Sequence, residues 1–242
     1  MSTLVQSITP ADAVASNPTS AAFSAALTVG SRIVAAVVTD HLGGTGAVTA
    51  VSGGGVTTWA KDVDQGSASP VSISMEIWSG VVTSSVTTGV SFTWSTTNNS
   101  HIWWFIQEWA NLGAFDKVSS IATGSGTAAL SGSTGVLAQA DSTVFGLFEW
   151  RTTAATTATL GAGYSGLIQG SNTNASSIMG GALESQNVSA TTSITAAVTL
   201  SPTNQWGALA AAYKNLSLGA AGPVTPPVMG GMTAAVARAS TW

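Results

Sequence analysis

The chain has 242 residues, of which six are lysine or arginine and ten are aspartate or glutamate, so its formal net charge is −4. Charged residues make up only 7% of the chain and hydrophobic residues 45%, and cysteine is absent. Isolated cations provide no basic track for a phosphate backbone, and without cysteine there is no disulfide, thiolate metal site or thiol nucleophile, so the composition argues against nucleic-acid binding and cysteine chemistry.

The first 19 residues are predicted to form a short N-terminal arm. The opening segment MSTLVQSITPADAV has neither the basic region nor the apolar region of a secretory signal. No run in the chain approaches the roughly 18 consecutive apolar residues of a membrane span. We therefore expect a protein that is assembled in the cytoplasm and has no membrane span.

From residue 20 onward, short β-branched and aromatic runs bounded by turn residues predict antiparallel strands. The clearest is VSISMEIW at 71–78, where apolar side chains alternate with Ser and Glu, which predicts a strand with one face in the core. Further strands are predicted for RIVAAVVTD from Arg32, VTTWAKDV from Val56, VSFTWS from Val90, HIWWFIQEW from His101, STVFGLFEW from Ser142, SSIMGGALE from Ser176, SITAAVTLS from Ser193 and QWGALAAAY from Gln205. No segment has the pattern of a capped amphipathic helix, although the last of these runs could be helical by propensity.

The chain also contains an apparent internal repeat. Residues 86–112 align with 191–216, the block from Leu27 aligns with the block from Leu137, and the block from Ala50 with that from Ala158. Two halves, 20–112 and 127–216, would then share one strand order. In this alignment Glu108 lies opposite Tyr213. The alternative is that two segments rich in Ala, Gly, Ser and Thr align by composition alone.

Three short blocks carry a resemblance to a known type of module: VTTW at 56–59, EIW at 76–78 and EWANLGAFD at 108–116, followed by Gly124 and Gly126. Together they resemble a sandwich module of actinobacterial phage minor tail proteins and bacterial surface proteins. The resemblance covers residues 20–216 and implies a jelly-roll-like antiparallel β-sandwich in a virion or on a cell surface. It carries no catalytic site.

After Leu216 the composition changes to a segment rich in proline and glycine, which predicts an extended C-terminal arm over 217–242. A disordered tail is the alternative. Apolar side chains favour an arm that docks on a neighbouring subunit, because a solvated tail would be rich in charge. The proposed subunit contacts are Val228, Met229, Met232, Val236 and Trp242.

Residues that could support chemistry are sparse. The two histidines, His41 and His101, have no metal-ligand spacing and no nucleophile motif near them. Asp62 and Asp64 supply too few oxygen ligands for calcium. The carboxylates near strand ends could pair as in a glycosidase, but solvated faces or turn hydrogen bonds are the simpler interpretation; they are Glu76, Glu108, Glu149 and Glu184. We predict no catalytic, metal or cofactor site.

Nine tryptophans among so few charges are the other notable feature. Trp103 and Trp104 must face opposite sides of one strand, so one belongs to the core. The other side is core, subunit contact or a platform for sugar rings, and Trp78 and Trp103 are the candidate glycan contacts.

The sequence thus favours a non-enzymatic structural protein of a bacteriophage virion, either a minor tail protein or a head-surface decoration protein. Its expected partners are other virion proteins and further copies of itself. The first alternative is a host-attachment or adhesion module that binds carbohydrate of the host envelope. A glycan-active enzyme on the same scaffold is the third interpretation, and sandwiches host all three roles.

Overall fold

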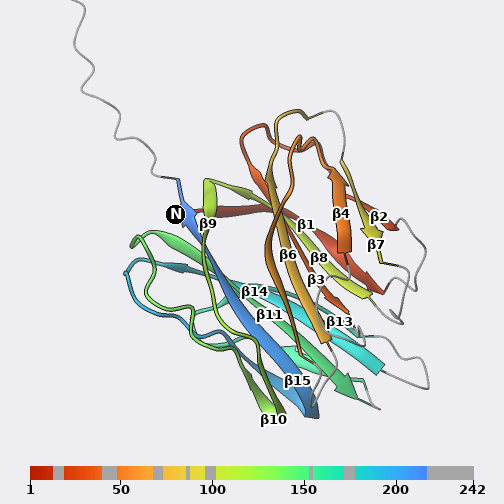
Figure 1. The fold of residues 1–242 in the computed structure, drawn as a ribbon, viewed down its shortest axis with the longest axis vertical. Coiled ribbons are helices and arrows are strands. Elements are labelled where there is room, and N and C mark those ends of the chain that lie inside the picture. The colour runs from red at the N-terminus through yellow and green to blue at the C-terminus, as the bar shows by residue number, and fades with distance from the viewer. Residues whose placement is uncertain are drawn as a thin grey trace, which may run out of the picture.

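The computed structural model describes residues 1–12, 19–39, 48–67, 73–85, 88–95, 102–152, 155–171 and 178–216, and within these ranges the protein is built from antiparallel strands without a helix. His41, His101 and the segment 217–242 lie outside the described residues. The all-β sandwich predicted from the sequence is confirmed (Figure 1).

The first half of the chain forms a sandwich of two sheets. A large sheet has the strand order β1-β8-β3-β6-β5, and a small sheet has the order β2-β7-β4. The strands are β1 (Thr3–Asp12), β2 (Thr19–Ala22), β3 (Arg32–Thr39), β4 (Val48–Gly53), β5 (Ala60–Ser67), β6 (Ile73–Val81), β7 (Gly89–Trp94) and β8 (Ile102–Ala110). Because the chain crosses between the two sheets after β1, β2, β3, β4, β6 and β7, the half is a jelly roll.

The second half repeats this arrangement with fewer breaks. Its large sheet has the order β10-β15-β11-β14-β13, with β12 and β9 also paired to β15. The strands are β9 (Leu112–Val118), β10 (Ala122–Leu130), β11 (Ser142–Thr152), β12 (Thr157–Thr159), β13 (Ser165–Ser171), β14 (Ile178–Val188) and β15 (Ala197–Asn215). The first residues of β15 pair with β12 and with the end of β10, whereas its later residues pair with β11.

The two large sheets therefore have matching strand orders, position by position: β1, β8, β3, β6 and β5 against β10, β15, β11, β14 and β13. A duplicated unit would produce this match. The predicted single sandwich is refined to two, because each half has its own buried cluster between a large sheet and an outer layer.

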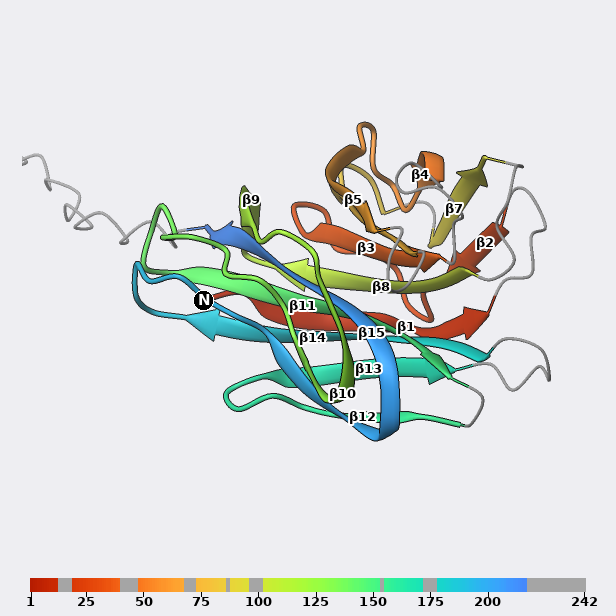
Figure 2. The ribbon, with the colours of Figure 1, turned by 60° about the horizontal axis from the view of Figure 1, so that its bottom comes forward.

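The two jelly rolls are joined through their large sheets, which pack face to face and place the outer layers on opposite sides (Figure 2). A third buried cluster lies between the large sheets and draws on both halves, with Val34, Phe105 and Met75 from the first and Phe145, Leu147 and Tyr213 from the second. Each large sheet is consequently covered on both faces.

This double coverage overturns the expectation of a single buried face for residues 71–78. In β6, Ile73 and Ile77 belong to the shared cluster, Trp78 belongs to the core of the first jelly roll, and Ser74 and Glu76 are buried as well. Glu76 accepts a hydrogen bond from the backbone N–H of Val48, and Ser79 donates one to Asp62, so these two polar residues make internal hydrogen bonds and do not face water.

The N-terminal segment also differs from expectation. Instead of an arm, residues Thr3–Asp12 form β1, an edge strand of the first large sheet that pairs with β8. Pro10 falls at the irregular pairing between Ile8 and Ala11. An edge strand tolerates proline at such a place because the missing N–H would have had no partner in the ladder.

Candidate functional site

The four carboxylates that the sequence offered for chemistry are all buried, with exposed fractions of 1% for Glu76 and Glu184 and 0% for Glu108 and Glu149. The interpretation as solvated faces is therefore wrong. Three of them accept hydrogen bonds from backbone N–H groups outside their own strand, two from connecting segments, at Thr28 and Gly161, and one from Val48 at the start of β4.

Glu108 ties a loop of the first jelly roll to the large sheet. Its Oε1 accepts hydrogen bonds from the backbone N–H of Thr28 and the hydroxyl of Ser31, each at 2.7 Å, and its Oε2 accepts one from Gln6 Nε2 at 2.6 Å. Burial opposes ionisation, but these donors outweigh it and lower the pKa of Glu108 below its usual value. The side chain acts as a charged anchor for the loop.

Glu76 is held by a cation as well as by a backbone donor. Lys61 Nζ lies 3.0 Å from Glu76 Oε2, the backbone N–H of Val48 donates to Oε1 at 2.8 Å, and Trp78 Nε1 donates to Oε2 at 3.1 Å. Lys61 also lies 5.0 Å from the centre of the Trp78 ring. Burial nevertheless raises the pKa of Glu76.

Among the described residues, Glu184 has no comparable cation. The backbone N–H of Gly161 donates to its Oε2 at 3.0 Å, whereas its Oε1 and the hydroxyl of the nearby Tyr164 are buried without a hydrogen-bond partner in the described part of the chain. Burial raises the pKa of Glu184 to about 7. Glu76 and Glu184 do not form a glycosidase-like pair, because they lie in the cores of different jelly rolls.

Asp62 and Asp64 lie on strand β5 and bind different partners. Asp62 Oδ2 accepts hydrogen bonds from Ser79 Oγ and from Tyr213 Oη, the latter at 2.6 Å across the junction of the two halves. Asp64 pairs with Lys61 at 3.2 Å. Their oxygens do not converge, and no group of three or more metal-ligating side chains occurs among the described residues.

The two tryptophans expected at a glycan platform are interior. Trp78 is 8% exposed and Trp103 is 6% exposed. Trp103 crosses the junction: its Nε1 donates to the backbone oxygen of Met179 at 3.1 Å, and its ring lies where a side chain on Gly170 of β13 would have to be. In this arrangement Trp103 joins the jelly rolls and cannot stack on a sugar. The proposed subunit contacts Val228, Met229, Met232, Val236 and Trp242 lie outside the described residues.

A hollow of about 420 Å³ opens at the junction, where β1 of the first jelly roll lies beside β13 of the second. Five hydroxyl side chains and one amide line it, namely Ser2, Thr3, Thr143, Ser165, Ser185 and Asn187. Leu4, Trp109 and Gly166 complete the lining. No sequence pattern predicts this site, because its residues come from distant strands and belong to no motif.

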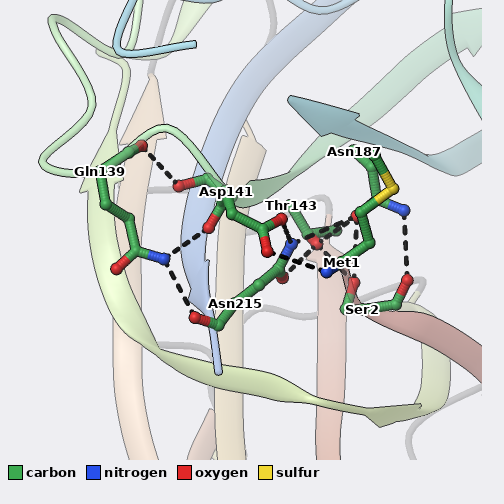
Figure 3. Close-up of polar contacts among 8 residues, drawn as sticks. Met1, Ser2, Gln139, Asp141, Thr143, Asn187 and Asn215 are labelled. Carbon is green, nitrogen blue, oxygen red and sulfur yellow. Dashed lines mark hydrogen bonds and ion pairs between the residues drawn. The ribbon is translucent and has the colours of Figure 1, made fainter. Parts of the chain in front are cut away.

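A polar network holds one wall of the hollow in place (Figure 3). Thr143 Oγ1 lies 2.8 Å from Asn187 Oδ1 and 2.7 Å from Asn215 Oδ1. Asn215 Nδ2 donates to Asp141 Oδ1 at 2.7 Å, and the Met1 ammonium group lies 2.8 Å from Asp141 Oδ2. The start of β1 and the end of β15 are therefore fastened side by side.

The protein belongs to the class of all-β proteins in which two jelly rolls pack through their large sheets. Three of its buried carboxylates accept hydrogen bonds from the backbone and so help to hold the fold. No protein-family model matches the chain, and no curated protein and no solved structure shows detectable similarity to it. The described residues contain no helix long and apolar enough to cross a membrane. Function therefore has to be inferred from the chain itself.

Proposed function

We propose that the protein is a non-enzymatic structural component of a bacteriophage virion, a minor tail or head-surface protein that acts through contacts with neighbouring subunits. The observation that carries this proposal is that buried carboxylates of the protein form hydrogen bonds that hold the fold together. Glu76, Glu108 and Glu184 each hold a backbone N–H, and Asp62 bonds the two halves together, so these groups are engaged in the architecture.

The composition supports the same role. With 7% charged residues, the chain presents few lysines and glutamates whose desolvation would oppose subunit packing. Large apolar side chains remain exposed at separate places on the described surface, among them Val29 at 61% and Val136 at 65%. The placement in a bacteriophage particle rests on the resemblance of residues 20–216 to minor tail modules.

The C-terminal segment is the proposed assembly device. Leu216, the last described residue before the segment 217–242, follows Asn215, whose side chain is linked through Asp141 to the Met1 ammonium group. The five apolar residues named above then contact a neighbouring copy or another virion protein.

Light scattering tests this proposal on the full chain beside a chain that ends at Leu216. We expect a defined oligomer for the full chain and a folded monomer for the shortened one, with the same circular dichroism. Monomers in both samples would contradict self-assembly through the C-terminal segment.

A further inference from the structure

We propose that the hollow between β1 and β13 is a binding site for a neutral sugar unit. This goes beyond subunit contacts and does not depend on where the protein is assembled. It also differs from a platform of exposed tryptophans, which the buried positions of Trp78 and Trp103 do not provide.

The hollow is produced by irregular pairing in two edge strands. The pairing of β1 with β8 shifts between Leu4 and Gln6, and the pairing of β13 with β14 shifts between Ser165 and Ile168. Gly166, with φ of 63°, takes the left-handed conformation inside the second irregularity. The two register shifts lie next to each other, since Leu4 is the neighbour of Gly166 across the junction, and β1 and β13 separate there. The volume of the hollow falls in the range of small-molecule sites.

The lining favours a ligand that is polar and uncharged. None of the described side chains that line the hollow is ionisable, and the nearby Met1 ammonium is already paired with Asp141. A charged ligand would lose its hydration there without gaining an ion pair. The hydroxyls of Ser2 and Thr143 lie within hydrogen-bond distance of each other, and those of Ser165 and Ser185 donate to each other's backbone oxygens. Each hydroxyl oxygen can still accept a further hydrogen bond, and a purely apolar ligand would cover this remaining capacity without using it. A sugar ring has many hydroxyl groups and an apolar face, so it suits both the polar rim and the contact with the partly exposed Leu4.

The polar groups are also fixed before any ligand arrives. Asn187 is exposed at the rim, and its Nδ2 donates to the backbone oxygen of Ser2 at 3.2 Å. An amide nitrogen carries two N–H donors, so one N–H of Asn187 remains for a ligand hydroxyl. Trp109 is held from below by a hydrogen bond from its Nε1 to Gln107 Oε1 at 3.1 Å and by an edge contact with Phe145. Such fixed groups lose little entropy on binding.

The test uses the full chain and an array of immobilised glycans, with neutral oligosaccharides of glucose, galactose and N-acetylglucosamine beside sialylated and uronate-containing ones. The neutral glycan that binds best is then titrated in solution by calorimetry. We expect binding to neutral glycans, with no preference for the acidic ones.

Ser165→Trp fills the hollow with a bulky side chain, and the matched control is Ser52→Trp, at an exposed serine of β4 outside the hollow. We expect Ser165→Trp to weaken binding at least tenfold and Ser52→Trp to leave it unchanged. Thr3→Trp, at an exposed residue on the opposite wall, replaces Ser165→Trp if that variant does not fold.

Three results would overturn the proposal: no binding of any neutral glycan, a preference for acidic glycans, or full binding by both hollow-filling variants. None of them bears on the oligomeric state of the full and shortened chains, so the failure of this proposal and the failure of the assembly role can be told apart.

Discussion

The two jelly rolls share a strand order but differ in how they accommodate a buried carboxylate. In the first, Glu76 faces Lys61 at 3.0 Å and receives a backbone and an indole hydrogen bond. In the second, Glu184 has backbone donors, and its Oε1 is buried without a hydrogen-bond partner. The same topology thus accommodates a buried carboxylate in two ways. In the first half Glu76 is paired with the cation Lys61, whereas in the second half Glu184 ionises only near neutral pH.

The largest expected effect concerns the junction that makes the two halves one body. Trp103→Ala removes the ring that packs on Gly170 and the hydrogen bond to Met179, and we expect it to lower the free energy of unfolding by about 3–5 kcal/mol. Trp59→Ala is the control, since that side chain is only half-buried. Chemical denaturation followed by circular dichroism measures both. Equal losses in the two variants would show that Trp103 has no special role at the junction.

Removing the cation of the first half should have the next largest effect. Lys61→Met leaves Glu76 buried without its charged partner, and we expect a loss of about 2 kcal/mol at pH 8. The loss should shrink as the pH is lowered, because burial raises the pKa of Glu76 and lets it take up a proton more readily than an ordinary carboxyl group. Lys117→Met removes the same charge from an exposed position and should change little. A loss of stability that does not change with pH would show that Lys61 does not act through the charge of Glu76.

The second half should respond to pH through Glu184. Its pKa is about 7 in the folded chain against 4.5 ordinarily, so between these values the folded state holds a proton that the unfolded state has released. Stability therefore falls as pH rises from 4.5 to 7, by about 1–2 kcal/mol once solvent screening reduces the roughly 3 kcal/mol that the full shift would give. Glu184→Gln should flatten this part of the stability profile, and Glu149→Gln is the matched control. The idea fails if the slope survives in Glu184→Gln.

The smallest effect is expected for the hydrogen bond from Tyr213 to Asp62, which crosses the junction at 2.6 Å. Tyr213→Phe keeps the ring contacts with Phe145 and Phe115 and removes only the hydroxyl. We expect a loss of about 1 kcal/mol, because Asp62 retains its hydrogen bond from Ser79. Thermal unfolding beside Phe145→Leu, which alters the ring packing instead, separates the two contributions. A loss as large as that of Phe145→Leu would mean that the hydroxyl does more than bond to Asp62.

Local pattern was enough to predict most strands. The runs from Arg32, Val90 and Ser142 correspond to β3, β7 and β11, because β-branched and aromatic residues between turn signals are a local property. The alanine-rich run from Gln205 forms part of β15, as its place in the repeat suggested and against its helical propensity. Tertiary pairing on both sides of β15 decides the matter.

The register of the repeat was not predicted correctly, because it depends on contacts between the two halves. An alignment that sets Glu108 against Tyr213 is one residue out of step, since Glu108 faces the interior of the first jelly roll while Trp109 and Tyr213 both pack edge-on against Phe145. A shift of one residue exchanges the two faces of a strand. With both faces buried, apolar and polar residues no longer mark inside and outside. Aligning the ends of the two segments, Leu112 with Leu216, instead sets Trp109 against Tyr213 and gives the register seen in the structure.

The length of β15 has a mechanical consequence. It runs without a break from Ala197 to Asn215, passing from the outer layer into the large sheet, and neighbouring strands accompany it along both parts. Tension applied at Leu216 would act along the axis of this strand, so its hydrogen bonds would bear the load in shear, many at once. If the protein is tethered through its C-terminal segment, a force on that segment would be distributed over the hydrogen bonds of both layers. The strands would then not separate one after another.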